Sequence, residues 1–157
     1  MDSLEILVSI RKIVRSLNLE SKSIQKEFGL SIPQLLCLNH LEKSPEQQSN
    51  HKNLMNLLCL NSSTVTGIIN RLEKRGYVAR IRSDGDRRVT RIQLTASGAK
   101  LVEGTPNVLH ERLAEKLVTL SPQDREMVQK ALEIIISAME IRKLEAAPVL
   151  TSEEIVD

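Results

Sequence analysis

Apolar residues recur at helical spacing near the start of the chain. Between about Leu4 and Lys26 they fall three or four positions apart, at Leu7, Ile10, Ile13, Val14 and Leu17. This period predicts an amphipathic helix, which Phe28-Gly29 ends. A second helix is predicted to begin at Ser31, whose hydroxyl can cap it while Gln34 reaches back as in a capping box.

Polar interruptions divide the middle of the chain into shorter elements. Residues 44–50 are polar and predict a loop, and the short third helix after them carries Leu54, Leu57 and Leu58. A tight turn at residues 61–63 precedes a fourth helix from Thr64 to Lys74. Gly76 ends that helix, because glycine tolerates the left-handed conformation beyond a helix end.

The rest of the chain predicts a hairpin and two further helices. Strands are expected over residues 78–83 and 88–94, with Asp84-Gly85 as the turn between them. Thr95 caps a fifth helix, which Pro106 either kinks or splits. Ser121-Pro122 opens a sixth helix that runs to about Leu144. The predicted fold class is therefore mainly α with a small β-wing, comprising six helices and a two- or three-stranded antiparallel sheet.

Composition supports packed helices and a cytoplasmic location. Phe28 and Tyr77 are the only aromatic residues among 157, so the core must be built from aliphatic side chains, which argues against a β-sandwich. No apolar run approaches the roughly 18 residues that a membrane span needs, and the N-terminus lacks the features of a signal peptide. In the cytoplasm, Cys37 and Cys59 are expected to be reduced thiols.

Charge is distributed unevenly along the chain. Residues 71–91 hold eight basic and three acidic side chains, a net charge of +5, although the whole chain has only +2. Residues 145–157 hold four acidic side chains and no basic one. This segregation predicts one cationic face and an acidic, flexible tail over residues 146–157.

The fourth helix has the face expected of a helix that reads DNA. At 100° per residue its apolar positions, Val65, Ile68, Ile69 and Leu72, fall on one side. The opposite side carries Ser63, Thr66, Gly67, Asn70 and Lys74, with Thr64 and Arg71 at its edges. Short polar groups suit base edges and basic groups suit phosphates, so this helix and the short one before it predict a helix-turn-helix.

The hairpin beside that helix predicts a DNA-binding wing. Its strands carry Arg80, Arg82, Arg88 and Arg91. An arginine at the hairpin tip can enter the minor groove, where the potential is most negative. Asp86 lies two residues from Arg88 and can pair with it, which would hold the arginine extended.

Two segments carry a resemblance to a known family. Residues 60–78, LNSSTVTGIINRLEKRGYV, resemble the recognition-helix segment of MarR-type regulators. Asp86-Arg87-Arg88, followed by residues 94–98, LTASG, resembles the wing signature of that family and the start of its next helix. The order of elements resembles the family over essentially the whole chain.

The resemblance implies an organisation and a function. It implies one domain over residues 1–145, with a winged helix-turn-helix over about 31–98 and dimerisation helices over about 1–30 and 99–144. Family members are mostly homodimeric repressors that bind pseudo-palindromic operators. Many release DNA when a small molecule, often an aromatic acid, fills a cleft between the dimer helices and the DNA-binding lobe.

The candidate DNA-binding residues combine the helix face, the wing and the resemblance. They are Ser62, Ser63, Thr64, Thr66, Gly67, Asn70, Arg71, Lys74, Arg82, Asp86, Arg87 and Arg88. The resemblance implies that Arg88 is the wing arginine and that Asp86 is its partner. Gly67 departs from the pattern, since many relatives carry arginine or another long polar residue there, and one direct base contact is then absent.

Other functional classes have weaker support in the sequence. No nucleophile with a base, phosphate loop or metal cluster indicates an enzyme, no cofactor is expected, and His40, His51 and His110 share no metal-ligand spacing. Cys37 and Cys59 lie in apolar neighbourhoods and are expected to be buried and inert. A cysteine-based redox regulator and a winged-helix module that binds protein remain as alternatives. The effector, the operator and the regulated genes stay open.

Overall fold

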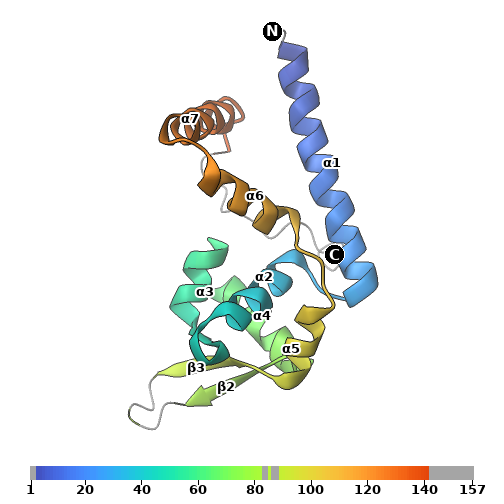
Figure 1. Cartoon of the computed structure of the whole chain (residues 1–157), viewed down its shortest axis with the longest axis vertical. Coiled ribbons are helices and arrows are strands. Elements are labelled where there is room, and N and C mark those ends of the chain that lie inside the picture. The colour runs from blue at the N-terminus through green and yellow to red at the C-terminus, as the bar shows by residue number, and fades with distance from the viewer. Residues whose placement is uncertain (1–2, 83–84, 86–88, 142–157) are drawn as a thin grey trace. The chain divides into compact units, whose positions relative to one another are not determined.

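The chain folds as two compact units that divide between Thr105 and Pro106. The computed structural model describes residues 3–82, 85 and 89–141. The first unit contains α1 (Ser3–Phe28), α2 (Ile32–Lys43), a short 3₁₀ helix (Pro45–Gln47), β1 (Gln48–Asn50), α3 (His51–Leu58), α4 (Ser62–Lys74), β2 (Val78–Arg82), β3 (Thr90–Leu94) and α5 (Ala96–Glu103) (Figure 1). The second unit contains α6 (Leu109–Thr119) and α7 (Pro122–Ala138). None of the helices in the described ranges has the length and apolar character to cross a membrane.

Local hydrogen bonds fix where the helices begin. At the start of α2 the predicted capping box is confirmed: the Ser31 backbone N–H donates to Gln34 Oε1 at 2.9 Å, and the Gln34 N–H donates to Ser31 Oγ at 3.3 Å. The predicted caps Thr95 and Ser121 are confirmed at α5 and α7. Gly29 joins α1 to α2 with φ of +65°, a backbone conformation that favours glycine.

The sheet has three antiparallel strands in the order β1-β3-β2. Ser49 pairs with Ile92 between β1 and β3, and Val78 pairs with Leu94 between β2 and β3. Val78, Ile92 and Leu94 are buried, so one face of the sheet packs on the helices. The described residues beyond the buried part of the hairpin, which are Ile81, Arg82, Gly85 and 89–91, are exposed.

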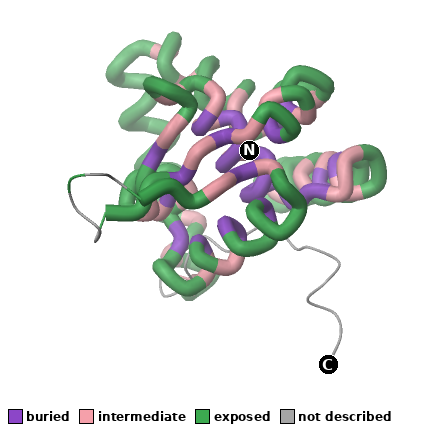
Figure 2. Tube along the Cα trace, turned by 90° about the horizontal axis from the view of Figure 1, so that it is seen from below, coloured by how far each residue is buried: buried purple, intermediate pink, exposed green. Residues whose placement is uncertain are grey.

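The core of the first unit is aliphatic, as the composition predicts. Its most completely buried aliphatic side chains come from α1, the α1–α2 junction, α2, α3, α4 and β2, and they are Ile24, Leu30, Leu35, Leu38, Leu41, Leu54, Val65, Ile69, Leu72 and Val78. Buried positions gather along the inner sides of the central helices, while exposed positions lie on the outside (Figure 2). Each such side chain stabilises the fold by about 1.5–3 kcal/mol relative to an exposed one.

Four details differ from the sequence-based expectation. The described residues form seven α-helices rather than six, because the chain leaves the helical path between Glu103 and Leu109, where Pro106 lies. The segment predicted as a polar loop, 44–50, contains the 3₁₀ helix and β1, which forms because β3 supplies hydrogen-bond partners. The last helix ends at Ala138 rather than near Leu144, and Glu140 is left-handed. α4 begins two residues earlier than predicted, at Ser62.

Candidate nucleic-acid interface

α3 and α4 form a helix-turn-helix. Cys59 ends α3 in the left-handed conformation, and Asn61 caps α4 by accepting a hydrogen bond from the Thr64 N–H at 2.8 Å. The predicted inner face of α4 is confirmed, because its apolar residues, Val65, Ile68, Ile69 and Leu72, are all buried. Their burial fixes which face of the helix points outward.

The outward face of α4 is polar and basic. The exposed residues among those predicted from the sequence are Ser62, Ser63, Thr66, Asn70, Arg71 and Lys74. Thr64 and Gly67 are partly buried. The face therefore offers hydroxyl, amide and basic groups, which are the groups that contact base edges and phosphates.

Gly67 leaves open space at the middle of this face. A Cβ atom added at Gly67 would have no heavy atom within 4 Å outside the helix's own backbone. Nothing within the described chain therefore requires a glycine there. Glycine costs a helix about 1 kcal/mol relative to alanine, and an external molecule that approaches α4 closely at this position would account for it.

Two polar side chains near the start of α4 are coupled to α3. Thr66 Oγ1 donates to the Ser62 carbonyl oxygen at 2.9 Å, and His51 Nε2 lies 3.0 Å from the same Thr66 Oγ1. Because the Thr66 hydroxyl hydrogen is already directed at Ser62, His51 Nε2 must be the donor in the second hydrogen bond. His51 thus holds Thr66 in one orientation, a role that the sequence did not indicate.

The wing is joined to α4 by an arginine. Arg80 on β2 donates from Nη1 to Glu73 Oε1 at 2.6 Å and from Nη2 to Asn70 Oδ1 at 2.5 Å. Its backbone N–H also donates to Glu73 Oε2 at 3.2 Å. Arg80 thereby occupies one of the two lone pairs of Asn70 Oδ1 and holds the amide in one orientation.

The wing residues divide into two groups. Arg82 and Arg91 are exposed on β2 and β3. Asp86, Arg87 and Arg88, with the predicted Asp84 of the turn, lie outside the described residues. The structure therefore brings together α4 and the base of the wing, and the roles assigned to the tip stay predictions.

Comparison with known proteins identifies the family. The sequence model of the MarR family matches residues 30–90, which span the helix-turn-helix and the wing. A helix-turn-helix transcriptional regulator of Bacillus subtilis, YfiV, is 31% identical over 90% of this chain and 87% of its own length. The chain belongs to the MarR family.

Solved structures of MarR-type proteins share this fold. A MepR-like protein in complex with pseudoligands has a TM-score of 0.60 and 26% identity, covering 87% of this chain and 95% of its own. Sco3205 of Streptomyces coelicolor, a MarR-family regulator in complex with DNA, has a TM-score of 0.61 and 20% identity. The match covers 88% of this chain and 89% of the Sco3205 chain. Its membership of the MarR family and its similarity to YfiV make this chain a DNA-binding transcriptional regulator and not an enzyme.

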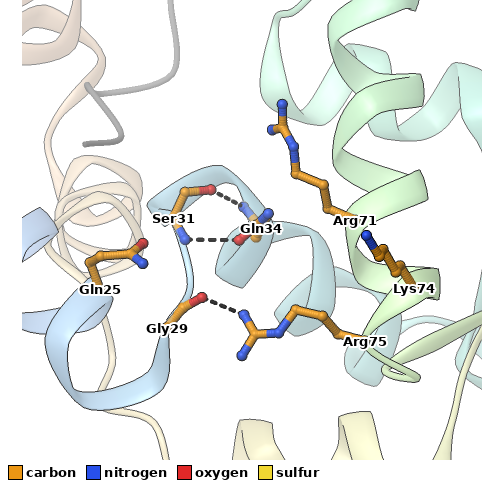
Figure 3. A pocket seen from close by; sticks show the side chains of 7 residues that line it. All are labelled: Gln25, Gly29, Ser31, Gln34, Arg71, Lys74 and Arg75. Atoms are coloured by element: carbon orange, nitrogen blue, oxygen red, sulfur yellow. Dashed lines mark hydrogen bonds between the residues drawn. The ribbon is translucent and has the colours of Figure 1, made fainter. Parts of the chain in front are cut away.

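Arg75 is a further residue of this MarR-family chain that sequence reasoning missed. It donates hydrogen bonds to the carbonyl oxygens of Gly29 (Figure 3) and, at 3.5 Å, of Phe28. Its guanidinium also lies 5.1 Å from the centre of the Tyr77 ring. Arg75 thereby ties the end of α1 to the end of α4, a contact between positions 46 residues apart.

The two cysteines of this MarR-family chain differ in their surroundings. Cys37 is fully buried on α2, and burial raises the pKa of its thiol to about 12, so it remains protonated and unreactive. Cys59 is exposed at the end of α3, where its thiol lies 3.5 Å from the Asn56 carbonyl oxygen. The expectation of two buried thiols is therefore wrong for Cys59, because the left-handed turn directs this residue away from the core. Among the described residues no cluster of three or more histidine, cysteine or acidic side chains could hold a metal ion.

Proposed function

We propose that this chain is a repressor that binds a pseudo-palindromic operator as a homodimer in the cytoplasm and that a small molecule releases it from DNA. The observation that carries the proposal is the outward face of α4, which presents hydroxyl, amide and basic groups beside an arginine-rich hairpin. In this arrangement α4 enters the major groove, and one protomer reads each half-site. Half-sites then lie about one helical turn apart, near 10 base pairs between centres.

The contacts divide by role. Ser62, Ser63, Thr64, Thr66, Gly67 and Asn70 face the base edges, whereas Arg71, Lys74, Arg82 and Arg87 contact phosphates. Arg88 enters the minor groove and Asp86 fixes its direction, as the family resemblance implies. Arg80 holds the Asn70 amide through Oδ1, and the Nδ2 group of Asn70 donates to an acceptor atom on a base.

Exposed apolar side chains support the homodimer. On α1 they include Leu4, Leu7, Ile13 and Leu19, each more than half exposed. On α6 and α7 they include Leu113, Val118, Met127, Leu132 and Ile134, also more than half exposed. Exposed aliphatic side chains that gather on one helix mark an interaction site, so we expect α1, α6 and α7 each to be covered by another surface. The same apolar helices of a second copy of this chain would bury these side chains against a surface that is equally apolar.

Release by a small molecule rests on relatives alone. The MepR-like protein was crystallised with pseudoligands, and MarR-type proteins are the structural neighbours of this chain.

Salt dependence of DNA binding tests the core of the proposal. Fragments selected by the protein from genomic DNA would be titrated at several salt concentrations, together with scrambled duplexes. Each phosphate contact contributes a slope of about −0.9 in log affinity against log salt, so Arg88→Ala should reduce the slope by about one unit. Binding to duplex DNA that is weak and independent of salt would favour a winged-helix module that binds protein.

The sign of the Asp86→Ala effect separates an ordered wing from a simple cationic patch. If Asp86 orients Arg88, removing the carboxylate weakens binding even though a negative charge near DNA is lost. Tighter operator binding by Asp86→Ala would contradict the orienting role and leave the wing as a general electrostatic contact.

Sedimentation tests the homodimer. Ile134→Glu places a charge on α7 at a side chain that is 69% exposed in the single chain, so the fold of one protomer should persist. The dimer should dissociate at micromolar concentration, because the charge would be buried without a partner. Gln123→Glu adds the same charge at an exposed polar position of α7 and should leave the dimer intact. A monomeric parent protein that binds one half-site tightly would contradict the proposal.

A further inference from the structure

The hydroxyl group of Thr66, on the outward face of α4, has two of its three hydrogen-bonding positions filled by the protein itself. A hydroxyl group has one hydrogen to donate and two lone pairs that accept. The Thr66 hydrogen is directed at the Ser62 carbonyl oxygen, 2.9 Å away, and His51 Nε2 donates to one lone pair at 3.0 Å. One lone pair of Thr66 Oγ1 is therefore left for another molecule, and no hydrogen is left.

The two hydrogen bonds together hold the hydroxyl in this state. If the Thr66 hydrogen turned outward, Thr66 Oγ1 and the Ser62 carbonyl oxygen would face each other at 2.9 Å with no hydrogen between them, which is repulsive. Threonine in a helix has two common χ1 rotamers, and the hydrogen bond from His51 stabilises the one that the structure shows. Thr66 therefore presents an acceptor oxygen in a fixed direction.

His51 reaches Thr66 from a fixed backbone position. It is the first residue of α3, whose start is held by Asn50, the cap that accepts from the Asn53 N–H at 2.8 Å. The inner sides of α3 and α4 are anchored in the core by Leu54 and Val65, both fully buried. The core thus sets the distance between the two helices, and His51 acts on a bound molecule only through Thr66.

Only two of the four bases supply the hydrogen that such an oxygen needs. In the major groove, adenine presents its N6 amino group and cytosine its N4 amino group, and both are donors. Guanine presents the acceptors N7 and O6, and thymine presents the acceptor O4 and a methyl group. A hydroxyl that can only accept pairs with adenine or cytosine, whereas a hydroxyl that turns freely pairs with any base.

We propose that Thr66 selects adenine or cytosine at one position of each operator half-site and that His51 is the residue that positions Thr66 for this selection. The inference rests on the proposed function, in which Thr66 faces the base edges. Its own content is the direction of the hydrogen bonds: the base donates, Thr66 accepts, and His51 and Ser62 keep the hydroxyl from reversing this direction.

Nitrogen magnetic resonance of the His51 ring tests the direction of its hydrogen bond in the absence of DNA. In the neutral ring, Nε2 should carry the hydrogen. The Nε2 signal should move in Thr66→Val, which keeps the shape of the side chain and removes its oxygen, while the signals of His110 on α6 should stay unchanged. A neutral His51 ring protonated at Nδ1, or an unmoved Nε2 signal, overturns the proposal.

Base analogues that lack an amino group test the selection. Fragments that the protein selects from genomic DNA would be scanned with purine in place of each adenine and with the corresponding pyrimidinone in place of each cytosine. At one position of each half-site, the analogue should weaken binding by the parent about 2- to 12-fold, the range for one neutral hydrogen bond. The same analogue should cause no further loss in Thr66→Val, because the contact is already absent.

Deaza analogues that lack only the N7 acceptor test the opposite direction. They should weaken binding by the parent and by Thr66→Val equally at every position. A deaza analogue whose effect disappears in Thr66→Val would show that Thr66 donates, and would overturn the proposal. The proposal is also overturned if no position shows coupling between Thr66 and an amino group.

His51→Gln and His51→Met are a matched pair that tests the positioning role. Both variants are uncharged and similar in length, but only glutamine keeps a donor, at Nε2, for Thr66. Discrimination against the amino-lacking base should persist in His51→Gln and fall toward the value for Thr66→Val in His51→Met. Equal discrimination by the two variants overturns the role of His51. A parent protein that does not prefer its selected fragments over scrambled duplexes contradicts the proposed function instead.

Discussion

Replacing Gly67 with alanine should stabilise this protein and weaken its binding to DNA. In the interior of a helix, alanine is favoured over glycine by about 1 kcal/mol. Apart from the α4 backbone and the neighbouring residues Thr66 and Ile68, none of the described residues has a heavy atom within 4 Å of a Cβ added at Gly67, so no clash offsets this gain. The free energy of unfolding should therefore rise by about 0.5–1 kcal/mol, and the melting temperature by about 1–4 °C.

The expected loss of DNA binding has a different cause. If base edges approach the backbone of α4 at Gly67, the added methyl group must push the helix outward and lengthen the neighbouring hydrogen bonds. A good base contact is worth about 1–3 kcal/mol, which corresponds to a loss of about 5- to 150-fold in operator affinity. Thermal unfolding and operator titrations on the same protein preparation measure the two effects separately.

Gly98→Ala is a control in which the same substitution should destabilise the protein. A Cβ atom at Gly98 would lie 2.2 Å from the Tyr77 carbonyl oxygen and 2.7 Å from Leu94 Cδ1. The Tyr77 oxygen also accepts a hydrogen bond from the Thr95 N–H at 3.1 Å, so α5 must shift from the sheet. Overpacking of this kind costs about 1–3 kcal/mol of stability. Operator affinity unchanged in a stabilised Gly67→Ala protein would refute the inference that DNA approaches α4 at this position.

Three further outcomes follow from the described contacts. A thiol reagent should modify one cysteine per folded chain, the exposed Cys59, and should reach Cys37 only after unfolding; two fast-reacting thiols would contradict the burial of Cys37. Burial raises the pKa of Cys37 from 9.0 to about 12 in the folded chain, which therefore retains a proton that the unfolded chain loses. The free energy of unfolding should consequently fall as the pH rises from about 9 to 12. Denaturant titration should show a smaller fall in Cys37→Ala. Arg80→Lys should weaken operator binding, since an ammonium cannot hold Glu73 and Asn70 in the fixed fork of a guanidinium, whereas unchanged affinity would show that this link does not position α4.

Structural features that involve only a few neighbouring residues could be predicted from the sequence. The capping box of Ser31 and Gln34, the Thr95 cap and the buried stripe of α4 each depend on atoms within one or two helical turns. Spacing and side-chain chemistry therefore determined where most helices begin and which face of α4 is buried. Family membership followed from the same local segments.

Contacts between distant segments were decided by the tertiary structure alone. Gln48–Asn50 is polar and predicts a loop, and it becomes a strand because β3 lies beside it and pairs with it. The sequence does not predict that Arg80 donates a hydrogen bond to the side-chain oxygen of Asn70. It also does not predict that Arg75 donates to the carbonyl oxygen of Gly29. Sequence periodicity describes one element at a time, whereas these hydrogen bonds exist only once folding brings the end of α1, α4 and the wing together.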